Sequence, residues 1–162
     1  MTDLAKPQSS GTDYLRLENG ENKIRIVSAI IDGWECWTHK DGGNQVYRQK
    51  AQFKGSQLDG MGVEKRAQKQ FYAAIVWNYA TERFECMVIT QATIKQAIYN
   101  ASFDPDWGSS IDYDFMISRS GEGLNTSYVV MPKPKKKFHL SVDELVYDLE
   151  QLYVGGNPMG DD

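Results

Sequence analysis

The alternation of hydrophobic and polar residues predicts short strands over much of the chain. Residues 22–31 (NKIRIVSAII) are rich in β-branched side chains and alternate at first, which predicts a strand. Residues 71–79 (FYAAIVWNY) are apolar on both faces of an extended strand. The pair Thr81-Glu82 separates that strand from residues 83–89 (RFECMVI), so the pattern predicts a β-hairpin over 71–90.

A second hairpin is predicted further along the chain. Residues 111–119 (IDYDFMISR) alternate strictly, which is the pattern of an antiparallel strand with one buried face. The segment Gly121-Glu122-Gly123 turns the chain toward a partner strand at 126–131 (TSYVVM). We expect Pro132 and Pro134 to end that strand, because proline cannot donate to a ladder.

Two helices are predicted between and after these hairpins. Thr90 is a good N-cap for a helix over about 91–101, which must end before Pro105. In the C-terminal part, a capping box and leucines at helical spacing predict a helix over about 142–153. The box is formed by Ser141 and Glu144, and the leucines are Leu145, Leu149 and Leu152.

Residues 32–70 have no clean period, although they contain local signals. Gly42-Gly43-Asn44 predicts a turn that joins strand ends near Trp37 and Val46. The stretch from Gly55 to Gly62 has the composition of a mobile loop. The expected organisation is therefore a flexible N-terminal arm at 1–13, a folded domain at 14–138, an acidic helix at 139–154 and a disordered tail at 155–162.

The order of these elements predicts the fold class. A strand, a hairpin, a helix and a second hairpin follow one another, with antiparallel pairs throughout. This order suits a mainly β fold: a five-stranded antiparallel OB-fold barrel with one inserted helix and a C-terminal helix. A β-sandwich or an α+β roll is the alternative.

The charge distribution changes the picture that the net charge gives. The 162 residues carry a net charge of −4, but residues 23–137 hold 16 Lys and Arg against 12 Asp and Glu, a net of +4. The acidic surplus lies at the two ends, which fits a body that binds a polyanion, or acidic ends that only aid solubility. No apolar run approaches the ~20 residues of a membrane span and no secretory signal opens the chain, so we expect a cytoplasmic protein.

Catalytic and metal-binding signatures are missing from the sequence. It contains no Walker A, GxGxxG, HExxH or GxSxG motif, so we expect no enzyme. Asp112 and Asp114 lie on one face of a strand and leave a metal-dependent nuclease as an alternative. Cys36 and His39 have the spacing of half a zinc site, but a structural site needs four ligands, so no metal and no other cofactor is expected.

Aromatic and basic residues are interleaved in the segment without a clean period. Single-stranded nucleic acid is bound by cationic grooves that follow the phosphates and by rings on which bases stack. A curled strand with buried rings and solvated cations would give the same pattern. The candidate single-stranded DNA (ssDNA) contacts are Trp34, Trp37, Lys40, Tyr47, Arg48, Lys50, Phe53, Lys54, Lys65, Arg66, Tyr79 and Arg83. The run 132–137 (PKPKKK) is a basic segment or a solvated linker.

Four segments together resemble the ssDNA-binding proteins of tailed phages and prophages. They are LRLENGENKIRIVS, IDGWECW, FYAAIVWNYATERFECMVITQATIKQAI and DPDWGSSIDYDFMISRSGEGLNTSYVVMPKPKKKF, and they span about residues 14–138. The resemblance implies an OB-fold that binds ssDNA without sequence preference in replication, recombination or repair.

The T-even phage helix-destabilising proteins look like more distant relatives. Those relatives carry a structural zinc in an insertion rich in Cys and His. The corresponding stretch here, about 34–70, keeps only Cys36 and His39, which supports a metal-free protein. Many members of that family end in a long acidic tail that recruits replication partners, whereas this sequence ends in GGNPMGDD. The acidic helix expected at 142–153 either recruits replication or recombination proteins in its place or packs on the barrel. A protein-interaction β-barrel of a phage replisome or virion, without a nucleic-acid role, is the alternative function.

Overall fold

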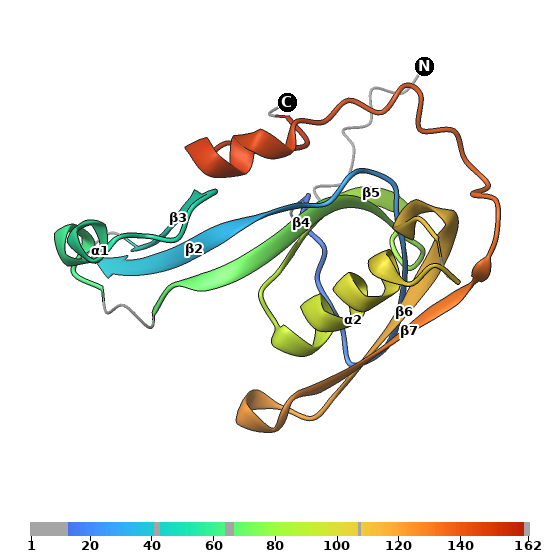
Figure 1. Cartoon of the computed structure of the whole chain (residues 1–162), viewed down its shortest axis with the longest axis horizontal. Coiled ribbons are helices and arrows are strands. Elements are labelled where there is room, and N and C mark those ends of the chain that lie inside the picture. The colour runs from blue at the N-terminus through green and yellow to red at the C-terminus, as the bar shows by residue number, and fades with distance from the viewer. Residues whose placement is uncertain (1–12, 41–42, 64–66, 107, 161–162) are drawn as a thin grey trace, which may run out of the picture.

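One antiparallel sheet of seven strands forms the body of the molecule (Figure 1). The computed structural model describes residues 13–40, 43–63, 67–106 and 108–160. The strands are β1 (Gly20–Ile26), β2 (Ile31–Lys40), β3 (Gly43–Gln49), β4 (Lys69–Asn78), β5 (Arg83–Ile89), β6 (Tyr113–Ser120) and β7 (Ser127–Lys135). Their order is β3-β2-β4-β1-β6-β7, and β5 pairs with the other edge of β4. The prediction of a mainly β protein is confirmed.

Strands β1 and β2 run along the same edge of β4 as one interrupted strand. Ile26 pairs with Val76 at the end of β1, and Ile31 pairs with Ala73 at the start of β2. Between them the side chain of Ser28 replaces a backbone acceptor, because its Oγ accepts a hydrogen bond of 2.8 Å from the backbone N–H of Ile75. The connection therefore stays bonded to β4 while the chain bends.

The expectation of a closed barrel with five strands is wrong in two respects. The sheet has seven strands, because residues 31–49 form a long hairpin of β2 and β3 that the sequence pattern did not resolve. In the described part of the chain, no ladder joins β5 to β7, so the sheet stays open there. The predicted pairing of the strand ends is confirmed, since Trp37 lies opposite Val46. Gly43 and Asn44, which were expected in the turn, belong to β3, and Gly42 lies outside the described residues.

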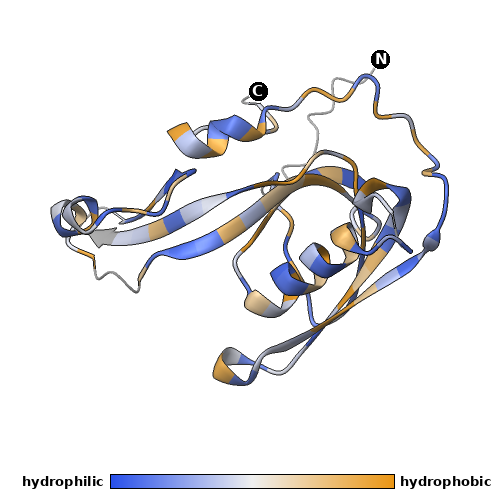
Figure 2. Cartoon of the chain, viewed as in Figure 1, coloured by the Kyte–Doolittle hydropathy of each residue, from blue (hydrophilic) through white to orange (hydrophobic). Residues whose placement is uncertain are grey.

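Both faces of β4 are buried, each in a different core. On one face, α2 (Ala92–Phe103) packs across the concave side of the sheet, between the β4–β5 pair and the β6–β7 pair (Figure 1). That core contains Ile24, Ile26, Ala74, Val76, Met87, Ile89, Ile94, Ile98, Ala101, Tyr113, Phe115 and Ile117. Figure 2 shows this concentration of hydrophobic residues along β4 and on α2.

The opposite face of β4 is covered by the C-terminal part of the chain. Leu149 and Leu152 of the 3-10 helix η4 (Leu149–Val154) pack on Phe71, Ile75 and other residues of β4 and β5. A smaller third core joins β2 to α1 (Gly55–Met61) through Cys36, Phe53 and Leu58. Residues 55–61 are thus a short helix where a loop was expected; Gly62 ends it with φ = 71°.

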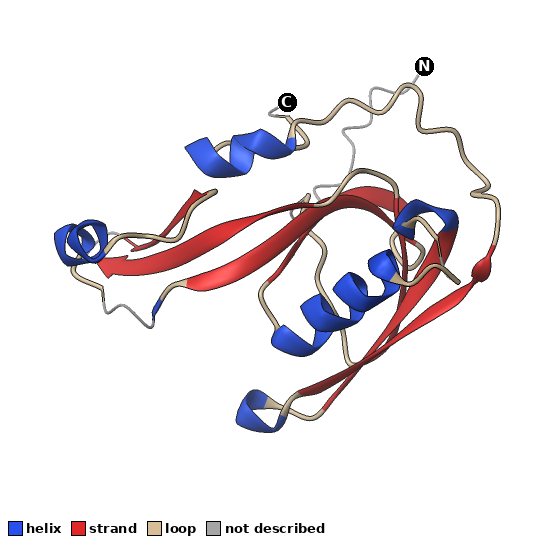
Figure 3. Ribbon diagram, viewed as in Figure 1, coloured by secondary structure: helices blue, strands red, loops and turns tan. Residues whose placement is uncertain are grey.

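The C-terminal segment differs from the predicted helix over 142–153. Residues 136–148 form loops, turns and bends along the outside of the molecule, and only 149–154 are helical (Figure 3). Ser141 Oγ accepts from the N–H of Asp143, a local turn that replaces the helix cap. Residues i and i+3 are eclipsed in a 3-10 helix, so Leu149 and Leu152 can both face β4.

The expected disordered tail is also different where it is described. The backbone N–H of Asp148 donates to the carbonyl oxygen of Pro158, and Met159 packs against the core on β4 and β5. We call residues 137–160 the C-terminal strap. Among the described residues, no helix is long and apolar enough to cross a membrane.

The predicted second hairpin is confirmed, but its second strand is longer than expected. The turn leads through η3 (Gly123–Asn125), and η2 (Ser110–Asp112) precedes β6. Strand β7 continues to Lys135, through Pro132 and Pro134, which were expected to end it. Proline is tolerated because β7 is an edge strand whose second side needs no donor.

We expect the C-terminal strap to increase the free energy of unfolding by burying apolar side chains, in addition to any effect on solubility. Leu152 is 2% exposed, so Leu152→Ala should lower the free energy of unfolding by roughly 2–5 kcal/mol through lost burial and a residual cavity. Val154, 75% exposed on the same helix, is the matched control, and Val154→Ala should change stability by about 0.5 kcal/mol or less. Urea unfolding of both variants makes the measurement. Equal stability of Leu152→Ala and the parent protein would show that the strap is a dispensable arm.

Candidate nucleic-acid interface

Four lysines line a cavity of about 490 Å³ on the outer side of β1, β6 and β7. They are Lys23 of β1, Lys133 and Lys135 of β7, and Lys136, which follows β7. We call this cavity the lysine groove. Met116 and Pro134 provide its apolar lining, and Asp114 is the one carboxylate among its described lining residues. The groove therefore carries an excess of positive charge on a chain that is acidic as a whole.

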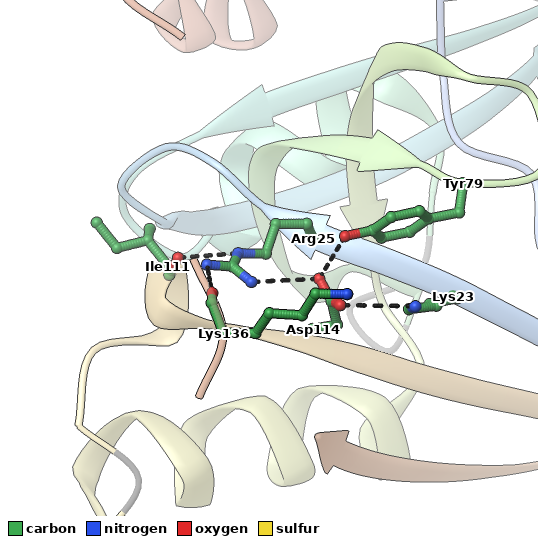
Figure 4. A network of polar contacts seen from close by, with 6 residues as sticks. All are labelled: Lys23, Arg25, Tyr79, Ile111, Asp114 and Lys136. Carbon is green, nitrogen blue, oxygen red and sulfur yellow. Dashed lines mark hydrogen bonds and ion pairs between the residues drawn. The ribbon is translucent and has the colours of Figure 1, made fainter. Parts of the chain in front are cut away.

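A buried carboxylate organises the floor of the groove. Asp114 is 3% exposed, and its Oδ1 accepts a hydrogen bond of 2.8 Å from the hydroxyl of Tyr79 (Figure 4). The Arg25 Nη1 lies 3.4 Å from the same oxygen, and the Lys23 Nζ lies 3.8 Å from Oδ2. Because Arg25 is equally buried, this pair neutralises itself inside the protein, and removal of either charge would leave the other uncompensated.

Arg25 also positions the lysine-rich end of β7. Its Nη2 donates to the backbone carbonyl of Lys136 at 2.6 Å, and its Nε donates to the carbonyl of Ile111 at 3.0 Å (Figure 4). The backbone N–H of Lys136 donates in turn to the carbonyl of Asp112. The backbone of the basic run is thus fixed at Lys136, while the side chains of Lys135 and Lys136 remain exposed.

Aromatic side chains continue from the groove onto β4 and the start of the strap. The Tyr79 ring lies under the Lys23 Nζ, 4.5 Å away, and stacks with the exposed ring of His139 at a centroid distance of 6.0 Å. Trp77 packs edge-on against Phe84 and His139. This arrangement combines cations for phosphates with ring surface for bases, which is the chemistry of ssDNA binding.

The predicted contacts on β2 and β3 do not form one surface. In the ladder, Glu35 is opposite Arg48 and Cys36 is opposite Tyr47, so Trp37 and Tyr47 lie on opposite faces of the hairpin. Both rings are exposed, at 43% and 37%. The Trp37 Nε1 donates to Glu35, which fixes the indole beside an acid.

Three other predicted contacts, two on this hairpin and one between β3 and α1, have structural partners. The Arg48 Nε is 3.0 Å from the Glu35 Oε1, and both side chains are largely buried. Phe53 is 7% exposed in the core with Cys36 and Leu58, and Trp34 packs against the same core. These placements favour the alternative that the sequence left open, in which rings of this segment are buried.

The remaining predicted contacts are divided between exposed, paired and undescribed residues. Lys50 is exposed beside Glu150 of the strap, at 3.5 Å, and Lys54 is exposed at the start of α1. Tyr79 and Arg83 are half-buried near the β4–β5 turn, and Arg83 is 3.2 Å from Glu85. Lys65 and Arg66 lie outside the described residues, as does the side chain of Lys40.

Three of the four groove lysines belong to the basic run at 132–137, although they were not among the predicted DNA contacts. The run at 132–137 was recognised as basic, but its extended prolines suit a linker as well as a binding strand. Lys23 and His139 gave no signal, because their proximity to this run depends on β1 pairing with β6 and on the path of the strap.

Neither cysteine provides a reactive or metal-binding centre in the described structure. Both are buried, and burial raises the pKa of the Cys86 thiol to about 12. The Cys36 Sγ lies 3.9 Å from the thioether of Met61. In the described ranges, no group of three or more His, Cys, Asp and Glu side chains could hold a metal ion.

The hydrogen bond between Tyr79 and Asp114 should be visible by titration. Burial and the bond to Asp114 raise the pKa of Tyr79 from 10.0 to about 12. Because the raised pKa favours the neutral phenol, the bond is intact below pH 10 and is lost as the pH rises through 12. We expect the absorbance titration at 295 nm of Tyr79→Phe, subtracted from that of the parent, to be centred near pH 12. A difference curve centred near pH 10 would show that the bond does not form.

Comparison with known proteins finds a distant relative among phage proteins. A protein of Escherichia phage T5, called a probable ssDNA-binding protein, is 23% identical to this chain over 154 aligned residues. The alignment covers 82% of this chain and 59% of the relative, so the chain matches less than two thirds of the relative's length. No family model and no solved structure matches the chain. The chain therefore has a distant resemblance to phage ssDNA-binding proteins.

Proposed function

We propose that this protein binds single-stranded DNA without sequence preference and without catalysis. The observation that carries the proposal is the lysine groove, in which four lysines surround a floor whose single carboxylate is already paired with Arg25. The distant likeness to the phage T5 protein supports the same class of ligand. In this proposal phosphates bind the lysines, and bases stack on the exposed ring of His139.

The arrangement of the strands supports an OB-like fold for this function. Without the β2–β3 hairpin, the strands lie in the order β5-β4-β1-β6-β7, and α2 connects β5 to β6. An OB-fold is a five-stranded, partly open barrel that binds oligonucleotides on its sheet and loops. The proposed nucleic-acid-binding domain is residues 14–138, with His139 at its margin.

The β2–β3 hairpin offers a second set of contacts for the same strand of DNA. Trp37 and Tyr47 are exposed rings on the hairpin, and Lys50 and Lys54 are exposed cations that follow β3 in the chain. Since the two rings lie on opposite faces, we propose that only one of them stacks on DNA in a given complex. We place the protein in phage DNA replication, recombination or repair, in the host cytoplasm. The exposed acids of the strap remain candidates for contacts with replication proteins.

Salt dependence of oligo-dT binding tests the lysine groove. For single strands, the slope of log K against log salt is about −0.7 per phosphate contact, so Lys133→Ala with Lys135→Ala should reduce its magnitude by roughly 1.4. Lys69→Ala, an exposed lysine at the start of β4, is the matched control and should leave the slope unchanged. Fluorescence anisotropy of labelled oligo-dT measures both. A slope unaffected by the double variant, or equal affinity for duplex DNA, would reject the groove as the site.

A stacking role for the hairpin predicts a different signature. Trp37→Ala should lose roughly 1–3 kcal/mol of oligo-dT affinity with little change in the salt slope, because a ring contributes no counterion release. Val129→Ala, which shortens an exposed side chain on β7, is the control for nonspecific loss. If Trp37→Ala instead lowers the melting temperature while the folded protein binds normally, then Trp37 is a structural residue.

A further inference from the structure

Strand β3 forms one edge of the sheet in the described part of the chain. Its seven residues pair with β2 on one side, and no described strand pairs with the other side. Alternate residues of an edge strand present free backbone N–H and C=O groups to solvent, which makes an open edge a template for another strand. The sequence of β3, GNQVYRQ, contains no proline that would prevent pairing.

The other two edges of the sheet are protected. Strand β7 contains Pro132 and Pro134, which alternate with Lys133 and Lys135. The edge of β5 is partly covered by the residues around Tyr14, where the N–H of Leu15 donates to the carbonyl of Cys86 and the N–H of Cys86 donates to the carbonyl of Asp13. Natural sheets avoid edge-to-edge association by such devices. Among the described edges, the one at β3 therefore differs from the others, because it has neither proline nor a covering segment.

Two helices from different parts of the chain form walls on either side of this edge. Figure 1 shows β3 between α1 and the C-terminal helix η4. The α1 wall is fixed to β3 by two reciprocal hydrogen bonds, of 3.3 and 3.1 Å, between the amides of Gln49 and Gln57. The η4 wall is fixed by the hydroxyl of Tyr153, which donates to the carbonyl of Asp32 at 2.8 Å. Both walls are thus held in place while the edge between them remains open.

The space between the walls is a cavity of about 540 Å³ whose lining includes Gln45–Gln49 of β3. This volume lies within the range of roughly 300–1,000 Å³ that is typical of ligand pockets. Phe53 and Met61 line the α1 side, and Tyr153 and Val154 line the η4 side. Of the described lining residues, Arg48 alone is charged, and Glu35 neutralises it at 3.0 Å. An uncharged segment with apolar side chains therefore complements this cavity better than a phosphate backbone.

We propose that this cavity, the β3 edge groove, binds an extended peptide of another protein as an additional antiparallel or parallel strand. Backbone groups of β3 would give the affinity, and alternate side chains of the peptide would contact the two walls. A second copy of this chain is disfavoured, because only Gln45–Gln49 of β3 line the cavity between the walls. A seven-residue edge also falls short of the area of roughly 1,200–2,000 Å² that stable dimers bury.

This inference does not depend on the lysine groove, although Tyr47 of β3 is also one of the two rings proposed above as alternative stacking contacts for DNA. In Figure 1 the groove at β3 and the end of β7, which carries the lysine groove, lie at opposite ends of the molecule. A peptide at β3 would therefore leave the lysine groove free, so the protein could bind DNA and a protein partner together. Failure of one proposal does not imply failure of the other.

A display library of random 12-residue peptides, selected on the full-length protein, tests the proposal. The most enriched peptide is synthesised, and its affinity is measured by fluorescence polarisation. Tyr47→Glu on β3 and Val154→Glu on η4 each place a charge at the groove, and each should weaken binding at least tenfold. Val129→Glu, on the distant edge strand β7, is the matched control and should bind the peptide like the parent. All three replaced side chains are exposed, so the fold should tolerate the changes.

Hydrogen exchange gives a second measurement that does not depend on the variants. Bound peptide should slow the exchange of backbone amides in β3 and leave those of β6 and β7 unchanged. The proposal is overturned if no peptide is enriched, if the enriched peptide binds the two groove variants as tightly as the parent, or if protection appears outside β3. It is also overturned if oligo-dT, and not the peptide, protects β3, because the groove would then be a nucleic-acid surface.

Discussion

The burial of both faces of β4 is the constraint on which the rest of the structure depends. Its residues alternate between the core under α2 and the core under the C-terminal strap, so neither layer alone could keep this apolar strand out of water. The strap must therefore return across the sheet after β7, although it carries four acidic residues and only one basic residue. The same strand also pairs with β1, β2 and β5, which makes it the element that joins the two ends of the molecule.

At one end, a buried ion pair sets the geometry of a cationic surface. Arg25 is paired with Asp114 and bonded to the carbonyl of Lys136, so the same guanidinium neutralises the floor of the lysine groove and fixes its rim. Lys135 and Lys136 are exposed to solvent, whereas Lys23 also contacts Asp114. The charges of the groove floor neutralise each other, and lysines stand around it. This arrangement is well suited to binding a flexible polyanion without reading its sequence.

At the other end, the β2–β3 hairpin extends the sheet beyond the cores on β4. The core that joins this hairpin to α1 contains few residues, so the hairpin relies on α1 and η4 for support. These two helices leave the backbone edge of β3 accessible. The rings that suggested DNA stacking are therefore divided: some complete the local core, and two remain exposed on opposite faces. The contacts proposed for the β2–β3 hairpin therefore differ from those proposed for the lysine groove.

The sequence by itself determined the two hairpins, α2 and the mainly β class, because period-2 alternation, turn residues and a Thr90–Ala101 helical pattern are local properties. It also identified the basic run near Lys133. Only the tertiary structure decided that Lys23 and His139 join this run, that Arg48 is bound to Glu35, and that Leu149 and Leu152 cover β4 without a long helix. These outcomes depend on which strands pair and on which face the strap crosses. Such long-range contacts leave no periodic trace in the chain.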